Sequence, residues 1–177
     1  MPATMLDRNH HLVESNLALL RQAMDLLSSL DDATYSHKLP LLFSNSIGAQ
    51  MRHIVEFYEC FLDGLDAVCI DYDARRRDDR LESSTAAAIE KIGALTARIA
   101  TLHSDDGLLW VRMEDAPAAN QDPFLTSSAS RELQVLLSHT VHHFALIAVA
   151  LRLLGIAVHP HFGVAPSTLR YRQHQAA

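Results

Sequence analysis

The amino-acid sequence predicts an all-α protein: an up-and-down four-helix bundle with a short irregular or strand-containing segment before the last long helix. Two observations lead to this prediction. In four segments the apolar residues recur every three or four positions, the spacing that places them along one face of an α-helix. The breaks between these segments are short, apart from residues 108–126, as is usual between neighbouring antiparallel helices.

Size and composition set the class of protein. The chain has 177 residues, of which 49% are hydrophobic, so we expect one domain covering residues 1–177. Its formal net charge of -6 argues against a nucleic-acid partner, which needs clustered basic residues. The longest apolar run, residues 144–151, is too short to cross a membrane, and the N-terminus carries no secretion signal. We therefore expect a cytoplasmic protein with no membrane partner.

The first predicted helix covers residues 10–27, whose apolar positions form a single stripe. The second is expected to follow a capping side chain at one of positions 44–46 and to extend to Val68. Cys60 and Cys69 would then lie on one helix, too far apart along its axis to form a disulfide. We expect both thiols to be reduced and non-catalytic.

A third helix is predicted from a cap at Ser83 or Ser84 to Leu102, and the polar residues 104–107 follow it. Residues 108–126 combine apolar side chains with two prolines. This composition fits either a short pair of strands or an ordered loop.

The last long helix is predicted over residues 130–154 and ends at Gly155, since glycine commonly follows the end of a helix. Two adjacent apolar stripes make it the most buried helix. After it we expect an irregular tail with a short helical turn at residues 167–172. The outward side of this helix is also less polar than solvent exposure requires, so we expect a homodimer, unless the first helix or the tail covers it. The residues on this outward side are Val135, Val141, Ala145, Ala148 and Val149.

Two histidines on the last helix form the first candidate site. His139 and His143 lie four positions apart, so their rings point in similar directions one turn apart and can bind one metal ion. Such a pair is a weak signal by itself, because buried histidines are commonly hydrogen-bonded to neighbouring side chains. Their stripe nevertheless faces the core, where an unpaired polar group costs about 1–3 kcal/mol.

His53, on the core side of the second helix, is the third candidate ligand. Glu56 lies three positions further on, where its carboxylate can bind the metal or orient the His53 ring. The alternative for Glu56 is a solvated surface carboxylate. Gln50, one turn before His53, has the same ambiguity.

Two segments resemble a known family. Residues 48–56 read GAQMRHIVE and residues 138–144 read SHTVHHF; together they are similar to the DinB-like family of bacterial proteins, over most of the chain. Residues 72–78 and 162–171 also resemble a subgroup of that family. The resemblance implies a four-helix bundle, often dimeric, of bacterial origin. The family name does not imply DNA binding.

By this resemblance, His53 and the pair His139 and His143 bind a divalent metal ion, with zinc or nickel favoured. Three histidine ligands leave at least one coordination position open, which is the arrangement of a catalytic rather than a structural metal site. Zinc there would lower the pKa of bound water to about 7, and it would equally stabilise a thiolate. Glu56 is the candidate for moving the proton.

The expected activity is therefore that of a metal-dependent enzyme acting on a small molecule. Relatives in the wider superfamily imply a thiol-dependent S-transferase using a low-molecular-weight thiol, and a small-molecule hydrolase fits the same metal chemistry. The alternative is a non-catalytic metal-binding or sensing bundle that acts through a dimer surface. We assign none of the following histidines to the metal: His10, His11, His103, His142, His159 and His161.

Overall fold

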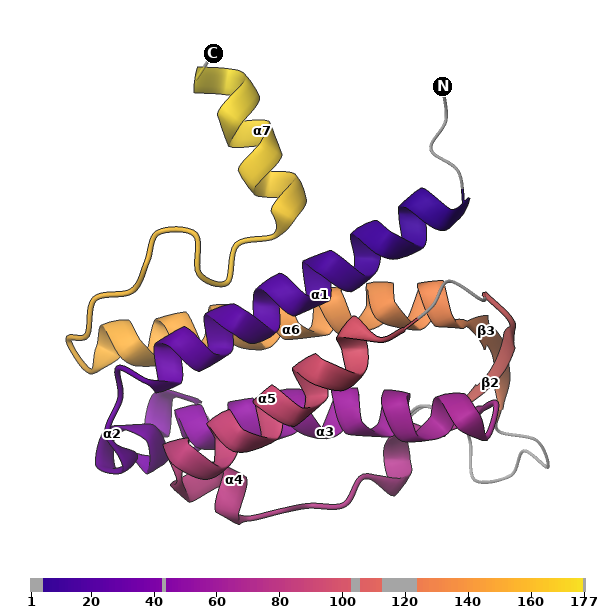
Figure 1. Cartoon of the computed structure of the whole chain (residues 1–177). Helices are drawn as coiled ribbons and strands as arrows, with labels where there is room; N and C mark the ends of the chain where they lie inside the picture. Colours follow the sequence, from indigo (N-terminus) through magenta and orange to yellow (C-terminus); the bar gives the residue numbers. More distant parts are fainter. Residues whose placement is uncertain (1–4, 43, 103–105, 113–123, 177) are drawn as a thin grey trace.

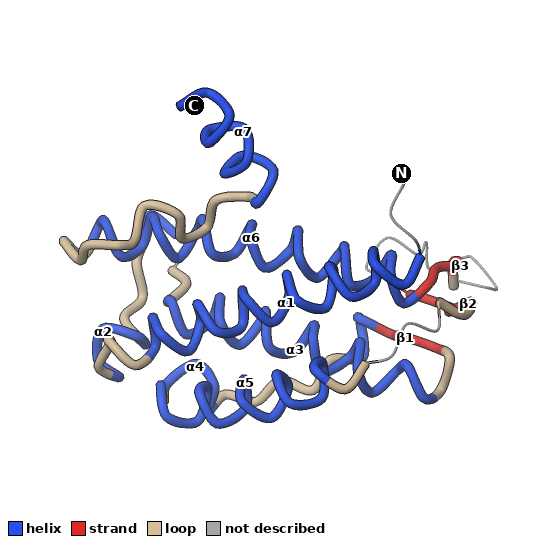
Figure 2. The backbone as a smooth tube through the Cα atoms, turned by 45° about the horizontal axis from the view of Figure 1, so that its top comes forward, coloured by secondary structure: helices blue, strands red, loops and turns tan. Residues whose placement is uncertain are grey.

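The computed structural model describes residues 5–42, 44–102, 106–112 and 124–176. These residues are mostly helical, with a small sheet at one end of the molecule (Figure 1). Helix α1 contacts α5 and α6, and α3 contacts the same two helices. Figures 1 and 2 show the four running side by side. The four long helices are α1 (Met5–Leu27), α3 (Ile47–Asp66), α5 (Thr85–Ala100) and α6 (Ala129–Leu153).

Serine side chains begin three of these helices. The Ser46 hydroxyl accepts a hydrogen bond from the backbone N–H of Ala49 at 2.9 Å, and Ser84 caps α5 in the same way. Both caps were among the predicted positions and are confirmed. Ser128 caps α6, which begins at Ala129, one residue before the predicted start, and Gly155 follows the helix with a positive φ of 74°, as predicted.

The second helix is shorter than predicted, because α3 ends at Asp66 and Cys69 begins a strand. The prediction that Cys60 and Cys69 share a helix was therefore wrong. At Gly64 the chain folds back so closely that a Cβ atom would lie 2.7 Å from the carbonyl oxygen of Cys69. Val68 makes the reversal with a positive φ of 56° and is 47% exposed, so its apolar side chain does not continue the buried stripe.

A three-stranded sheet covers this end of α3. Strands β1 (Cys69–Asp71), β2 (Leu108–Arg112) and β3 (Leu125–Ser128) lie in that order, with β1 parallel and β3 antiparallel to β2. The strand pair considered for residues 108–126 is confirmed, whereas β1 was not predicted. Residues 113–123, with both prolines of that segment, and His103 lie outside the described residues.

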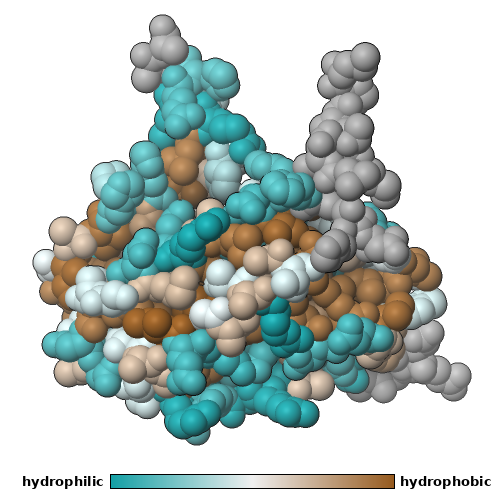
Figure 3. Space-filling model, viewed as in Figure 1, coloured by the Kyte–Doolittle hydropathy of each residue, from teal (hydrophilic) through white to brown (hydrophobic). Residues whose placement is uncertain are grey.

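The shorter helices are α2 (Asp32–Ser36), α4 (Arg80–Ser83) and α7 (Pro166–Ala176), with 3-10 turns at Pro40–Leu42 and Tyr72–Ala74. Helix α7 is longer than the predicted turn. It stands away from the long helices in both backbone views (Figures 1 and 2) and is largely hydrophilic (Figure 3). The segment before it packs on α6, where Phe162 stacks on Phe144 with ring centroids 4.4 Å apart.

That contact covers part of the surface on which a dimer was expected. The backbone of Ala145 lies so close to Gly163 that a Cβ atom on the glycine would be 2.7 Å from the Ala145 nitrogen. Ala148 is buried, at 5% exposure, and so does not belong to an outward face. Val149 remains 44% exposed. The tail therefore covers some, though not all, of the predicted face.

A buried polar network fixes how α1, α3 and α6 pack. The Tyr58 hydroxyl donates to the side-chain oxygen of Asn16 at 2.7 Å and accepts from the Thr140 hydroxyl at 3.3 Å. The Asn16 amide nitrogen donates to the carbonyl oxygen of Leu133 at 3.0 Å. Because unpaired buried polar groups are costly, sliding one of these helices along another would break several hydrogen bonds at once.

Helix α6 is long and apolar enough to cross a membrane, with a mean hydropathy of 1.4 over its most apolar window. It contacts α1 and α3, and 39% of that window is buried inside the molecule. Length and composition alone therefore do not make α6 a membrane helix.

The close approach of α3 and α4 can be tested with a pair of glycines. In Gly48→Ala the new Cβ would lie 2.0 Å from the carbonyl oxygen of Glu82, a backbone atom that cannot move aside alone. We expect a loss of about 1–3 kcal/mol in the free energy of unfolding, measured with urea. The matched control is Gly93→Ala in α5, where nothing lies within 4 Å and stability should rise by up to about 1 kcal/mol. Equal effects of the two substitutions would contradict this packing.

Candidate metal centre

Three histidines converge where α3 meets α6. The Nε2 atom of His139 lies 3.2 Å from Nε2 of His53 and 3.1 Å from Nε2 of His143. One ring nitrogen from each residue lies within 4.8 Å of the others. Helical spacing brings His139 and His143 together, while His53 arrives from α3 through the packing of the two helices. The structure therefore brings together all three ligands predicted from the sequence.

Gln50 orients one of these rings. Its side-chain oxygen lies 2.6 Å from Nδ1 of His143 and accepts a hydrogen bond from it. The proton of a neutral His143 is therefore on Nδ1, and the lone pair on Nε2 faces the other two histidines. Orientation of a metal-binding imidazole through its second nitrogen is the usual supporting arrangement in metal sites. Gln50, ambiguous from the sequence, is 9% exposed and directed at the site.

The environment keeps two of the imidazoles, those of His139 and His143, uncharged. Burial, followed by the neighbouring histidines, lowers the pKa of His139 to about 3, and burial together with His53 and His142 lowers the pKa of His143 to about 4. Both are neutral at pH 7 and thus able to bind metal.

The donor set fits a divalent metal ion. A tetrahedral site with metal–nitrogen bonds of about 2.0–2.1 Å needs ligand nitrogens about 3.3–3.4 Å apart, close to the observed spacings. Without a cation, only one of the two Nε2 contacts of a neutral His139 can be a hydrogen bond, because Nε2 carries either one proton or one lone pair. The other contact is then left without a hydrogen bond. A cation at the centre satisfies all three nitrogens.

Aromatic side chains form one wall of this cluster. Phe57 stacks on His139 with ring centroids 3.9 Å apart, and it packs edge-to-face with His53, with ring centroids 4.8 Å apart. Phe57 also stacks against Tyr72, and the Arg75 guanidinium lies 4.8 Å from the centre of the Phe57 ring. These contacts were not predicted from the sequence. Their only signal was the position of Phe57, four residues after His53 on the same helix.

Glu56 is not a solvated carboxylate, since it is only 2% exposed. Its carboxylate lies 3.5 Å from Nε of Arg52 and 4.0 Å from Nε of Arg75. Burial raises its pKa, and the two arginines oppose that shift. The alternative reading of Glu56 as a surface group was therefore wrong, while its catalytic role stays a prediction.

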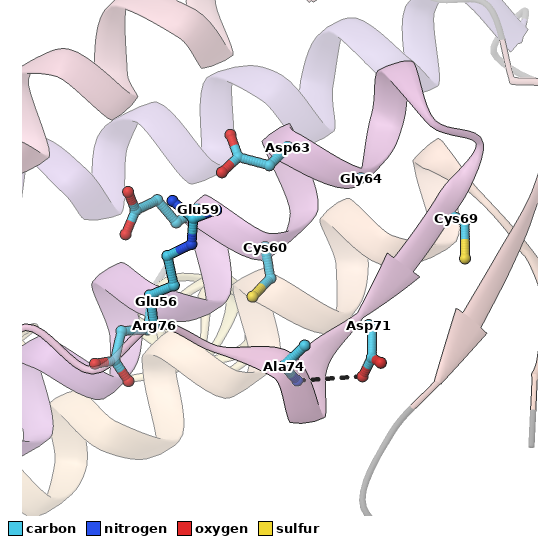
Figure 4. Close-up of a pocket in the computed structure, with 9 residues that line it drawn as sticks. All are labelled: Glu56, Glu59, Cys60, Asp63, Gly64, Cys69, Asp71, Ala74 and Arg76. Carbon is cyan, nitrogen blue, oxygen red and sulfur yellow. Dashed lines mark hydrogen bonds between the residues drawn. The ribbon is translucent and has the colours of Figure 1, made fainter.

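A cavity of about 250 Å³ has Glu56 in its lining and none of the three histidines. Figure 4 shows Cys60 near its centre. Burial raises the pKa of the Cys60 thiol to about 11, so the thiol is protonated at neutral pH and a poor nucleophile. Each carboxylate in its lining has a basic partner: Glu56 with Arg52, Glu59 with Lys91, Asp63 with Arg98 and Asp71 with Arg112. The cavity therefore does not compete with the histidines as a metal site.

None of the other described histidines joins the cluster, although His142 lies beside it with its ring centroid 5.1 Å from that of His143. His10, His11, His142, His159 and His161 are exposed. Within the described part of the chain, the cluster of His53, His139 and His143 is the one group of three or more histidine, cysteine or acidic residues arranged to hold a metal ion. Leaving the other described histidines unassigned therefore agrees with their positions.

The metal-free protein is expected to lose stability as the pH falls from about 6.5 to about 4. In this window the unfolded chain takes up protons on His139 and His143, whereas the folded site keeps both rings neutral until about pH 4 and pH 3. Acid therefore favours unfolding. Urea unfolding at a series of pH values should show a shallower pH dependence for the double variant His139→Gln, His143→Gln. An unchanged dependence would contradict the lowered pKa values.

Comparisons with known proteins agree with this geometry. The chain is 29% identical over 168 residues to FK506-binding protein 5 of the fungus Rhizopus delemar. The match covers 92% of this chain, which spans 38% of the length of that relative. The expected bacterial origin stays a prediction. The model of the DinB family, a family with a metal-binding fold, matches residues 5–165, a range that covers most of the chain and includes the positions of all three histidines. The chain belongs to the DinB family.

Proposed function

We propose that this protein is a divalent-metal-dependent enzyme whose metal ion is bound by His53, His139 and His143. The observation that carries the proposal is the convergence of three imidazole nitrogens from two helices, with two of the rings held neutral by burial. Membership of the DinB family supports it independently.

The reaction class follows from the donor set. Three neutral ligands leave at least one coordination position for a substrate or water. A divalent ion in such a site acts as a Lewis acid that lowers the pKa of a coordinated water or thiol. We propose a thiol-dependent S-transferase using a low-molecular-weight thiol, with hydrolysis of a small molecule as the second activity that this chemistry supports.

The chain's own residues have distinct parts in this proposal. His143 is held with Nε2 directed inward by its hydrogen bond to Gln50. Phe57 places an apolar ring against His139 and His53, which keeps water from that side of the site. A drier environment strengthens the interaction between the ion and an anionic sulfur or oxygen atom of the substrate.

The arrangement of the helices, the oligomeric state and the cellular location are also proposals. The contacts of α1 and α3 with α5 and α6 support the up-and-down four-helix bundle predicted from the sequence. The exposed apolar side chains of Val149 and Leu153 on α6 support a homodimer, which light scattering would test. We also propose a cytoplasmic location.

Metal content is the first test. Elemental analysis should find about one divalent ion per chain in protein purified without a histidine tag or nickel column. His53→Ala and His139→Ala should each lose it, because two remaining ligands bind weakly. The exposed His161→Ala is the matched control and should keep the metal. No metal in the native protein, even after reconstitution with zinc or nickel, would overturn the proposed function.

The two reaction classes separate in a second test. Cobalt-substituted protein should gain a thiolate-to-metal charge-transfer band when 2-mercaptoethanol is added, if the open position accepts thiols. Without such a band, turnover of simple esters would favour hydrolysis. A bound ion that responds to neither thiols nor small anions would indicate a non-catalytic metal-binding or sensing protein and contradict the enzymatic proposal.

A further inference from the structure

His139 lacks the hydrogen bond that usually aims a metal-binding imidazole. Its Nδ1 atom is buried and has no hydrogen-bond partner among the residues that the structure describes, whereas Nδ1 of His143 is paired with Gln50. In protein metal sites the second ring nitrogen commonly donates to a carboxylate, carbonyl or water, which fixes the ring orientation. The orientation of His139 must therefore have another source.

Ring stacking supplies that source. The Phe57 and His139 rings are 3.9 Å apart at their centroids and inclined by only 22°, so one ring covers the other. Phe57 cannot turn freely, because it is 5% exposed and stacks on Tyr72 with centroids 4.9 Å apart and planes inclined by 18°. Tyr72 itself is fully buried.

Polar contacts anchor the far side of this stack. The Tyr72 hydroxyl donates to Oε2 of Glu132 on α6 at 2.9 Å. Arg75 donates to the carbonyl oxygen of Tyr72 and places its guanidinium over the Phe57 ring, a cation–π contact. Glu56 on α3 lies 4.0 Å from Nε of Arg75. The stack is thus tied to both helices that carry the histidines.

We propose that Phe57 positions His139 for metal binding, in place of a hydrogen bond. Tyr72 and Arg75 hold the Phe57 ring, and Glu56 in turn anchors Arg75. In this assignment Glu56 is a positioning residue at the outer end of the stack rather than a group that moves protons. The inference rests on the proposed function, since it concerns the same metal ion.

The test compares two buried phenylalanines of α3. Phe57→Leu removes the ring beneath His139, whereas Phe61→Leu, one turn further along, removes a fully buried ring from the core. Cobalt affinity and the cobalt visible spectrum are measured in tag-free protein. We expect Phe57→Leu to bind cobalt about 10–100-fold more weakly, with a changed spectrum, as for other losses of support behind a metal ligand. Phe61→Leu should keep the affinity within about twofold and the spectrum unchanged, although both variants lose stability.

A second pair of variants tests the role of the Arg75 guanidinium. Arg75→Gln and Arg76→Gln remove the same charge from neighbouring positions, but Arg76 is exposed. We expect Arg75→Gln to lower cobalt affinity and alter the spectrum, and Arg76→Gln to do neither. This pair decides the question if circular dichroism shows that Phe57→Leu does not fold.

Equal affinities and spectra within each pair would overturn the positioning role of Phe57 and Arg75, while leaving the proposed function intact. A native protein that binds no cobalt at all would instead overturn the proposed function, and this inference would fall with it.

Discussion

The contact between α3 and α6 is the constraint on which the candidate site depends. Two imidazoles on one helix meet a third from another, and their Nε2 atoms approach to 3.1 and 3.2 Å. A displacement of about 1.5 Å, one residue of helix rise, would separate them. The adjacent network of Asn16, Tyr58 and Thr140 resists that displacement, because Thr140 follows His139 directly and is hydrogen-bonded to α3.

This arrangement is costly without a cation. Burial removes the imidazoles from water, and only one of the two Nε2 contacts of His139 can be a hydrogen bond. A bound divalent ion offsets both costs, because it binds the ring nitrogens in place of water. Metal binding and folding stability are therefore coupled through the same three side chains. The two rings on α6 are supported differently, one by an amide oxygen and the other by an aromatic face.

Periodic patterns along the chain predicted most of the helical structure. The apolar stripes located α1, α3, α5 and α6, and serines just before α3 and α5 located their N-terminal caps. The stripe failed at Val68, where apolar character continues but Gly64 allows the chain to fold back as β1. A three-residue strand has too few positions for a recognisable alternation, so β1 depends on pairing with β2, which lies 37 or more residues away in sequence.

The candidate site could likewise be predicted only in part from patterns along the chain. Spacing on one helix paired His139 with His143, and core position indicated His53. Only part of the surroundings of Glu56 could be predicted in this way, because Arg52 precedes it by four positions on α3 whereas Arg75 comes from a different segment. Phe57 was also missed, since a phenylalanine on an apolar face usually serves only the core.

X-ray absorption at the metal edge of the reconstituted protein is the most direct measurement of the central claim. A first shell of nitrogen atoms at about 2.0–2.1 Å, with the outer-shell pattern of imidazole rings that weakens in His139→Ala, is the predicted result. A shell dominated by sulfur at about 2.3 Å, or by oxygen alone, would contradict the three-histidine site.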